Sequence, residues 1–127
     1  MLVDTLGLIQ TLVVHEGDFQ DPEGAWFLIA KMAGRFPRLT KMWADSRYTG
    51  LVETMARLFG CDLEIVRRSP QARGFEVQPK RWIVERTFGW LCRYRRLTRD
   101  YEEQPASSEA MIYLAMSHLM VRRLRPA

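Results

Sequence analysis

The sequence predicts an α/β domain in which helices pack on a sheet that is at least partly parallel. Apolar runs typical of strands alternate along the chain with stretches of helical periodicity, and this alternation is the pattern of a layered α/β fold. The 127 residues, 47% of them hydrophobic, suffice for one domain but not for two. No stretch approaches the roughly 20 uncharged apolar residues of a membrane span. We therefore expect a single domain, 1–127, that works in the cytoplasm and not at a membrane.

The first third of the chain contains signals for two strands and a helix. Two apolar runs, Leu2–Asp4 and Leu8–His15, flank the segment Thr5–Gly7, which predicts two strands joined by a tight hairpin or bend. Asp21–Glu23 then combines an N-cap acid, a proline suited to the first turn and a second acid, and this combination favours a helix start. The helix is expected to end at Gly34, since glycine commonly terminates helices.

The middle of the chain is predicted to contain two strands with a helix between them. Lys41–Asp45 is expected to be a short buried strand, and Cys61–Val66 alternates apolar and polar residues as a strand does. The helix between them opens at Thr49 or Gly50 and ends at Gly60. Its side chains expected to face the core are Leu51, Met55 and Leu58.

Two helices are predicted in the second half. The first runs from Pro79 to Thr98, and the last, from Glu109 to Leu124, is capped by Ser107 or Ser108. On a helical wheel, one half of the first helix is apolar, and the other half carries five arginines around a single carboxylate, that of Glu85. These arginines are Arg81, Arg86, Arg93, Arg96 and Arg99.

Basic residues are concentrated in this second half. Residues 1–63 carry 6 basic and 8 acidic side chains, whereas residues 64–127 carry 13 basic and 7 acidic ones. All but one of those 13 are arginines, whose planar guanidinium groups suit phosphate binding. Charge alone leaves two interpretations open, a polyanionic partner or a solvated basic face.

The carboxylate of Glu85 also has two interpretations. It can neutralise the helix surface through a pair with Arg81 four residues earlier, or it can bind a divalent metal while the arginines hold phosphates. A metal site needs a second acid. Asp45 is the best candidate because it ends a buried strand, where ligand sites of α/β folds usually lie; its alternative role is that of a turn-forming aspartate.

The segment Pro79–Glu103, with the sequence PKRWIVERTFGWLCRYRRLTRDYEE, closely resembles the C-terminal catalytic segment of DDE-type insertion-sequence transposases of the family four/five group. The strings LVDTLGLIQTLVVHEGDFQD, WADSRYTG and GFEVQPKRW match the same family in order. The resemblance therefore covers essentially the whole chain.

The resemblance implies roles for three residues by position. Glu85 corresponds to the third catalytic acid of the family, Asp45 to the second, and Arg81 to the arginine of a Tyr–Arg–Glu–Lys signature. The chain departs from that signature, since Gln78 stands at the tyrosine position and Cys92 at the lysine position. These departures concern the positioning of DNA and leave the two acids unaffected.

The resemblance also implies an RNase H-like transposase catalytic core. In that fold the first strand is central, lies between strands two and four, and carries the first catalytic aspartate. We expect the chain to begin at strand two and to lack this first strand. An alternative first acid is Asp4, which ends a strand, although in the family this aspartate shapes the turn.

The implied function is DNA transposition, in which Mg²⁺ or Mn²⁺ held by three acids supports the cutting and rejoining of DNA phosphodiesters. We expect metal to bind only to a complete site and this chain to be inactive alone. Its expected partners are DNA, as transposon ends and target, an upstream-frame polypeptide that supplies the missing strand and aspartate, and further copies in an active oligomer. The expected location is the nucleoid of a bacterial cytoplasm. The alternative is a non-catalytic DNA-binding remnant that uses the arginine face of the helix at 79–98.

Overall fold

The chain folds into a mixture of helices and short strands, as predicted. The computed structural model describes all residues except 16, 18–20, 68, 72, 75–79 and 125–127. Two compact units are distinguished: Met1–Phe19 together with Ile83–Ala127, which we call the terminal unit, and Gln20–Trp82, the middle unit. Within the described ranges, no helix is long and apolar enough to cross a membrane.

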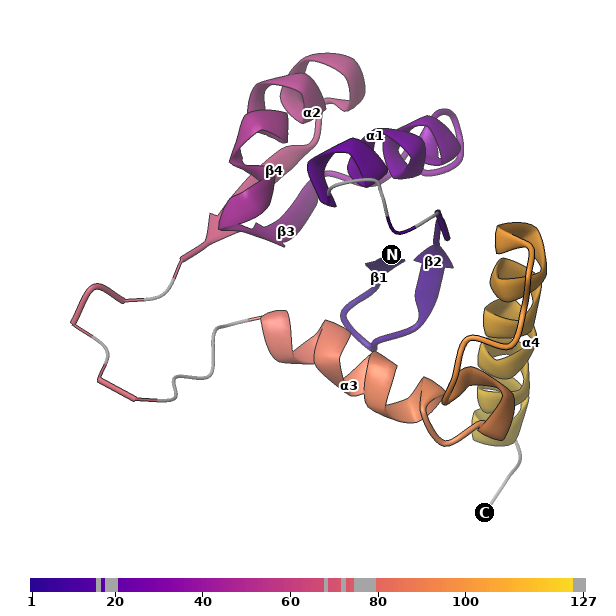
Figure 1. The fold of residues 1–127 in the computed structure, drawn as a ribbon. Helices are drawn as coiled ribbons and strands as arrows, with labels where there is room; N and C mark the ends of the chain where they lie inside the picture. Colours follow the sequence, from indigo (N-terminus) through magenta and orange to yellow (C-terminus); the bar gives the residue numbers. More distant parts are fainter. Residues whose placement is uncertain (16, 18–20, 68, 72, 75–79, 125–127) are drawn as a thin grey trace. The chain divides into compact units, whose positions relative to one another are not determined.

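The terminal unit begins with the predicted hairpin (Figure 1). Strands β1 (Leu2–Val3) and β2 (Ile9–Thr11) pair antiparallel and form a two-stranded sheet. Gly7 lies in the turn with a φ of 83°, a left-handed conformation that glycine adopts without steric cost. The hairpin prediction is confirmed, with strands shorter than expected.

Strand β2 is short because the backbone N–H groups that follow it donate hydrogen bonds to side chains of a helix and not to another strand. The N–H of Leu12 donates to the hydroxyl of Tyr113 at 3.1 Å, and the N–H of Val14 donates to the carboxylate of Glu109 at 2.9 Å. Both side chains belong to α4 (Pro105–Leu124). Backbone groups satisfied in this way need no sheet ladder, so the chain leaves the strand soon after it has formed.

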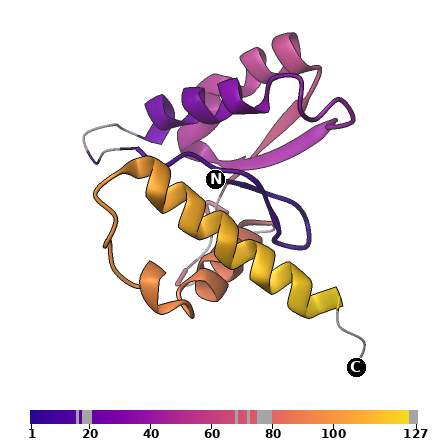
Figure 2. The ribbon, with the colours of Figure 1, turned by 90° about the vertical axis from the view of Figure 1, so that its right-hand side faces the viewer.

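The hairpin packs with α4 and with the end of α3 (Arg81–Leu91) around a small apolar core. Helix α4 is long, and Figure 2 shows it along its length. It begins at Pro105, earlier than the predicted start at Glu109, because proline suits the first helical turn. The buried residues of this core are Ile9, Leu12, Leu91, Ala115 and Met116.

The prediction of one long helix reaching Thr98 is wrong. Helix α3 ends at Leu91, Tyr94 is extended with φ −89° and ψ 116°, and a short 3-10 helix, η2 (Arg95–Leu97), follows. The expected start at Pro79 lies outside the described residues. The chain turns at Tyr94, and both Tyr94 and Leu97 pack against the core of the terminal unit.

The middle unit holds a parallel pair of strands, β3 (Lys41–Asp45) and β4 (Asp62–Val66). The two run in register from Lys41 opposite Asp62 to Asp45 opposite Val66, which confirms the expected parallel pairing. They form a second two-stranded sheet. The connection between parallel strands requires a crossover, which is made by η1 (Ser46–Leu51) and α2 (Val52–Phe59).

Helix α1 (Asp21–Met32) completes the middle unit. Gly60 ends α2 in the left-handed conformation, with a φ of 60°, as its position predicts. The expected burial of Leu58 is wrong, because its side chain is 62% exposed. Leu51 belongs to the 3-10 turn before α2, so the α-helical spacing that placed Leu58 beside it does not apply. The buried apolar residues of the unit are Ala25, Ile29, Met32, Leu51, Met55, Cys61 and Leu63.

Candidate functional site

Asp45 lies at the carboxyl end of β3, level with the carboxyl end of β4. This is the edge at which open α/β sheets bind ligands. The side chain is half-buried, and one of its oxygens, Oδ1, accepts a hydrogen bond from the N–H of Arg47 at 2.9 Å, which caps η1. The cap holds the carboxylate at the strand end. Asp45 thus has the turn-forming role that the sequence left open, and a carboxylate at an edge suited to ligands.

Glu85 lies in the second turn of α3 with an exposed side chain. Ile83 and Thr87 lie on the opposite side of α3 and are buried, and their packing holds the helix in place. Glu85 belongs to the terminal unit and Asp45 to the middle unit. Their pairing in one metal site therefore stays a prediction.

The five arginines expected on one helix face do not share a helix. Only Arg81 and Arg86 lie on α3, because the helix ends at Leu91. Arg81 is exposed. The arginine face of a helix at 79–98 is thus replaced by two separate groups, one on α3 and one on the segment that follows it. The later group comprises Arg93, Arg96 and Arg99.

Arg86 is engaged in packing within the terminal unit. Its Nη2 donates to the carbonyl oxygen of Leu6 at 2.9 Å, and its guanidinium lies 4.8 Å from the ring centroid of Trp90. The guanidinium of Arg123, from α4, lies 4.3 Å from the same ring centroid. Arg86 therefore ties the hairpin turn to α3, and a role in DNA binding, which stays a prediction, would compete with these contacts.

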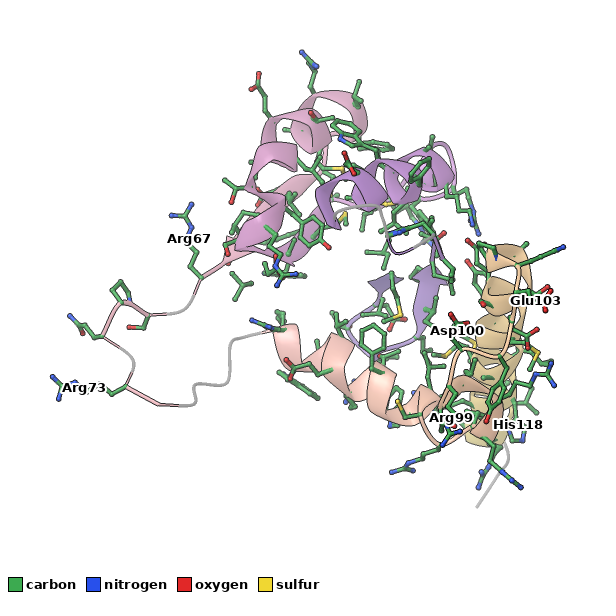
Figure 3. The ribbon with its side chains drawn as sticks, in the orientation of Figure 1. Arg67, Arg73, Arg99, Asp100, Glu103 and His118 are labelled. Carbon is green, nitrogen blue, oxygen red and sulfur yellow. The ribbon has the colours of Figure 1, made fainter. Side chains whose placement is uncertain are left out.

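The arginines beyond α3 differ in their engagement. The Nε of Arg96 donates to Glu102 at 2.7 Å, and this hydrogen bond raises the pKa of the guanidinium above its usual range. Arg93 and Arg99 are exposed, and Figure 3 shows Arg99 on the segment that leads to α4. Arg95, which the helical wheel did not single out, is exposed beside them.

Asp4 serves the hairpin turn. Its Oδ1 accepts hydrogen bonds from the N–H groups of Leu6 and Leu8, each at 2.9 Å, and its Oδ2 accepts one from the Gln10 amide at 3.2 Å. A carboxylate so engaged within its own turn has a structural role. Asp4 therefore has the role that the resemblance assigns to it.

A divalent metal ion needs several oxygen ligands close together. Carboxylate oxygens such as those of Asp45 and Glu85 are the ligands that Mg²⁺ prefers. In the parts of the chain that the structure describes, however, no group of three or more His, Cys, Asp or Glu side chains could hold a metal ion. The described residues alone do not fit a complete metal site.

One contact that the sequence did not reveal joins the hairpin to α3. The hydroxyl of Thr87 is buried and donates to the carbonyl oxygen of Gly7 at 2.7 Å. A Cβ added at Gly7 would lie 2.9 Å from that hydroxyl and 3.0 Å from the ring of Trp90. The only sequence signal was the glycine in the turn, and it says nothing of the partner 80 residues away.

A comparison with protein families matches residues 1–120 to the family described as the transposase DDE domain. The match includes both Asp45 and Glu85, and it extends over residues of both units. Searches of curated proteins and of solved structures found no match.

Proposed function

Because the chain belongs to the transposase DDE domain family, we propose that it acts in DNA transposition as part of a metal-dependent core that cuts and rejoins DNA phosphodiesters. The family match over residues 1–120 carries the proposal. In this proposal Asp45 and Glu85 are two of three catalytic acids. Bound Mg²⁺ or Mn²⁺ would stabilise the attacking and leaving oxygens at the DNA phosphate.

The third acid and one strand come, in this proposal, from a polypeptide segment outside this chain. Among the described strands, β1 pairs with β2 and β3 pairs with β4, and the two sheets share no strand. In an RNase H-like sheet the central strand lies between strands two and four, which correspond to β1 and β3. A strand that pairs with both would make the two units parts of one domain and would bring the missing aspartate. An upstream reading frame is the proposed source.

The proposal predicts a specific division of activities. The 127-residue chain alone should show no Mg²⁺-dependent cutting or joining of the ends of its own DNA element. The chain extended at its N-terminus by the upstream-encoded residues should show both activities. In the extended protein, Glu85→Gln and Asp45→Asn should each abolish the chemistry while DNA binding, measured by fluorescence anisotropy, persists. Metal-dependent joining by the unextended chain would overturn the need for a further segment.

The nucleotide sequence upstream of codon 1 provides an independent check. A continuation, in frame or shifted, that encodes an apolar strand with an aspartate supports the proposal. If no such continuation exists, the second candidate function gains support. Either result is available before any protein is made.

The second candidate is a DNA-binding protein without catalysis, which works at the bacterial nucleoid. The exposed arginines of the segment after α3, among them Arg93 and Arg99, favour it, because exposed guanidinium groups are suited to phosphates. Each arginine that contacts a phosphate should contribute about one unit to the dependence of binding on salt concentration. Arg99→Ala should therefore lower the salt dependence by about one unit. For this function Glu85→Gln should leave binding unchanged or tighter.

Arg86→Ala provides a contrast to Arg99→Ala. Arg86 contacts Leu6 and Trp90 within the protein, so its replacement should lower protein stability and leave the salt dependence of DNA binding unchanged. An equal reduction of the salt dependence by both substitutions would contradict the separation of the arginines into a packing group and a DNA-binding group.

A further inference from the structure

Helix α4 carries an exposed apolar stripe on the side away from the core of the terminal unit. Five exposed residues follow one another at intervals of four, three, four and three, the heptad spacing of helices that pair. The exposed fractions of its three large side chains are 63% for Leu114, 55% for Val121 and 81% for Leu124. The stripe consists of Ala110, Leu114, Ser117, Val121 and Leu124.

The stripe is distinct from the face by which α4 packs into its own unit. Ala115 and Met116 are buried in the core, and Ile112 and Leu119 pack against it. An exposed helix face normally carries charged residues, and this stripe contains none. In Figure 2 α4 runs across the front, and none of the described elements of the terminal unit is drawn over it. The described residues of the terminal unit therefore leave this stripe uncovered.

The polar groups at the centre of the stripe are already satisfied. The hydroxyl of Ser117 donates to the carbonyl oxygen of Tyr113, one turn earlier, at 2.8 Å. Beside it, Nδ1 of His118 lies 2.9 Å from the hydroxyl of Tyr94. A polar group with an internal partner loses little when a neighbour covers it. Ser117 can therefore be covered by another helix at low cost.

We propose that two copies of this chain pair through the α4 stripe with their helices antiparallel. In such a pair centred on Ser117, each Leu114 faces Val121 of the other copy, and the small Ala110 faces the large Leu124. Side chains of complementary size then meet at every position. A parallel pair would place the largest side chains against themselves and the smallest against themselves.

Charge favours the same orientation. Glu103 lies just before the N-terminal end of α4 and Arg122 lies in its last turn, and both are exposed, whereas Glu102 and Arg123 are engaged with Arg96 and Trp90. Figure 3 shows Glu103 toward the N-terminal half of the helix and His118 toward its C-terminal half. An antiparallel pair brings acidic ends against basic ends, whereas a parallel pair brings like charges together, which lowers affinity.

The interface is small. From Ala110 to Leu124 the stripe extends about 21 Å, at 1.5 Å per residue. A single helix face of this length buries less than the roughly 1,600 Å² of a standard interface. We therefore expect a dimer that forms at micromolar concentrations. The proposal concerns the protein without DNA, so it does not depend on the catalytic proposal, and the failure of one leaves the other unaffected.

Sedimentation equilibrium of the purified chain without DNA tests the dimer. The wild-type chain should shift from monomer to dimer as its concentration rises through the micromolar range. Leu114→Glu should weaken association at least about tenfold, because the charge enters the interface twice. Leu58→Glu is the matched control, since Leu58 is exposed to nearly the same extent, 62%, but lies on α2; it should change nothing. A wild-type chain that stays monomeric, or equal effects of the two substitutions, would overturn the proposal.

Disulfide cross-linking tests the orientation without a disruptive charge. In a Cys92→Ser background, Ser117→Cys should form a covalent dimer on mild oxidation, because the two positions meet at the centre of an antiparallel pair. Leu114→Cys should not, since the two copies of that position lie apart. Cross-linking through both positions shows a parallel pair, and cross-linking through neither shows that the stripe is not paired; both results contradict the antiparallel dimer.

Discussion

Replacing Gly7 by alanine probes the contact that holds the hairpin turn against α3. The backbone of Gly7 has a φ of 83°, and an added Cβ would lie 2.9 Å from the Thr87 hydroxyl and 3.0 Å from the Trp90 ring. Real Cβ atoms do not approach other atoms so closely, so the turn or α3 would have to move. Movement would also strain the hydrogen bond of 2.7 Å from Thr87 to the carbonyl oxygen of Gly7.

The free energy cost can be divided into two parts. An L-residue in the left-handed region costs about 1–2 kcal/mol, and overpacking of a well-packed site costs about 1–3 kcal/mol. The reduced entropy of the unfolded alanine chain returns about 0.4–1 kcal/mol. The expected net loss is therefore about 2–4 kcal/mol, a large share of the 5–15 kcal/mol typical of whole proteins.

Urea denaturation followed by far-UV circular dichroism measures this loss, and two other glycines provide controls. Gly34 has a φ of 71° but no atom within 4 Å of an added Cβ, so Gly34→Ala should cost only the backbone part, about 1 kcal/mol. Gly89 lies inside α3 and also has open space around it, so Gly89→Ala should stabilise the chain by about 0.5–1 kcal/mol. Equal losses for the Gly7 and Gly34 variants would refute the close packing of the turn on α3.

Three further outcomes are expected. Thr87→Val removes the buried hydroxyl and should cost about 1–2 kcal/mol in the same urea assay, whereas Thr87→Ser should retain most of the stability; equal losses would show that the hydroxyl contributes nothing. The Lys41 ammonium, 2.7 Å from Glu64, donates a hydrogen bond that lowers the pKa of that carboxyl below its ordinary value of 4.5. The stability that this ion pair contributes is therefore present above pH 4.5 and is lost as the pH falls through the folded-state pKa of Glu64. Glu64→Gln should flatten the acid side of a plot of Tm against pH, and an unchanged plot would exclude this ion pair as a contributor. Burial raises the pKa of the Cys61 thiol, and thiolate is the reactive form, so mass spectrometry should find iodoacetamide on the exposed Cys92 well before Cys61; similar rates would contradict the burial of Cys61.

Elements with strong local signals were predicted closely. The strand Lys41–Asp45 has the predicted bounds, and Gly60 ends its helix as expected. In both cases the deciding interactions lie within a few residues of the chain. The run of three apolar residues between Lys41 and Asp45 favours a strand, although the expected burial is wrong, because Lys41 is exposed and the other four residues are half-buried. The left-handed conformation at Gly60 depends on the absence of a side chain.

The end of α3 could not be predicted in this way. No glycine or proline stands between Leu91 and Thr98, so the local sequence favours continuation of the helix. The turn at Tyr94 arises because its ring and Leu97 pack into the core and its hydroxyl contacts His118. These partners come from α4 and β2, and the local pattern contains no information about them.

The residues of the candidate site also differ in how far the sequence predicts their roles. Asp45 and Glu85 follow from local pattern, a strand end and a helix face, and from the family resemblance, and all of these depend only on the order of residues in the chain. Whether an arginine is exposed or engaged depends on which surface it meets after folding. Arg86 contacts the carbonyl oxygen of a residue 80 positions earlier, whereas Arg99 remains exposed.

The sequence by itself determined the family of this protein, the order of its strands and helices and the two acids proposed for catalysis, because these follow from residue order and short-range preferences. Only the tertiary structure decided that the arginines form two groups, that Gly7 fits against Thr87, and that one side of α4 is buried while the other exposes an apolar stripe. These features depend on contacts between segments far apart in the chain. Apolar residues around α4 show only that the helix packs on something, and the fold determines which of its faces is left for a partner.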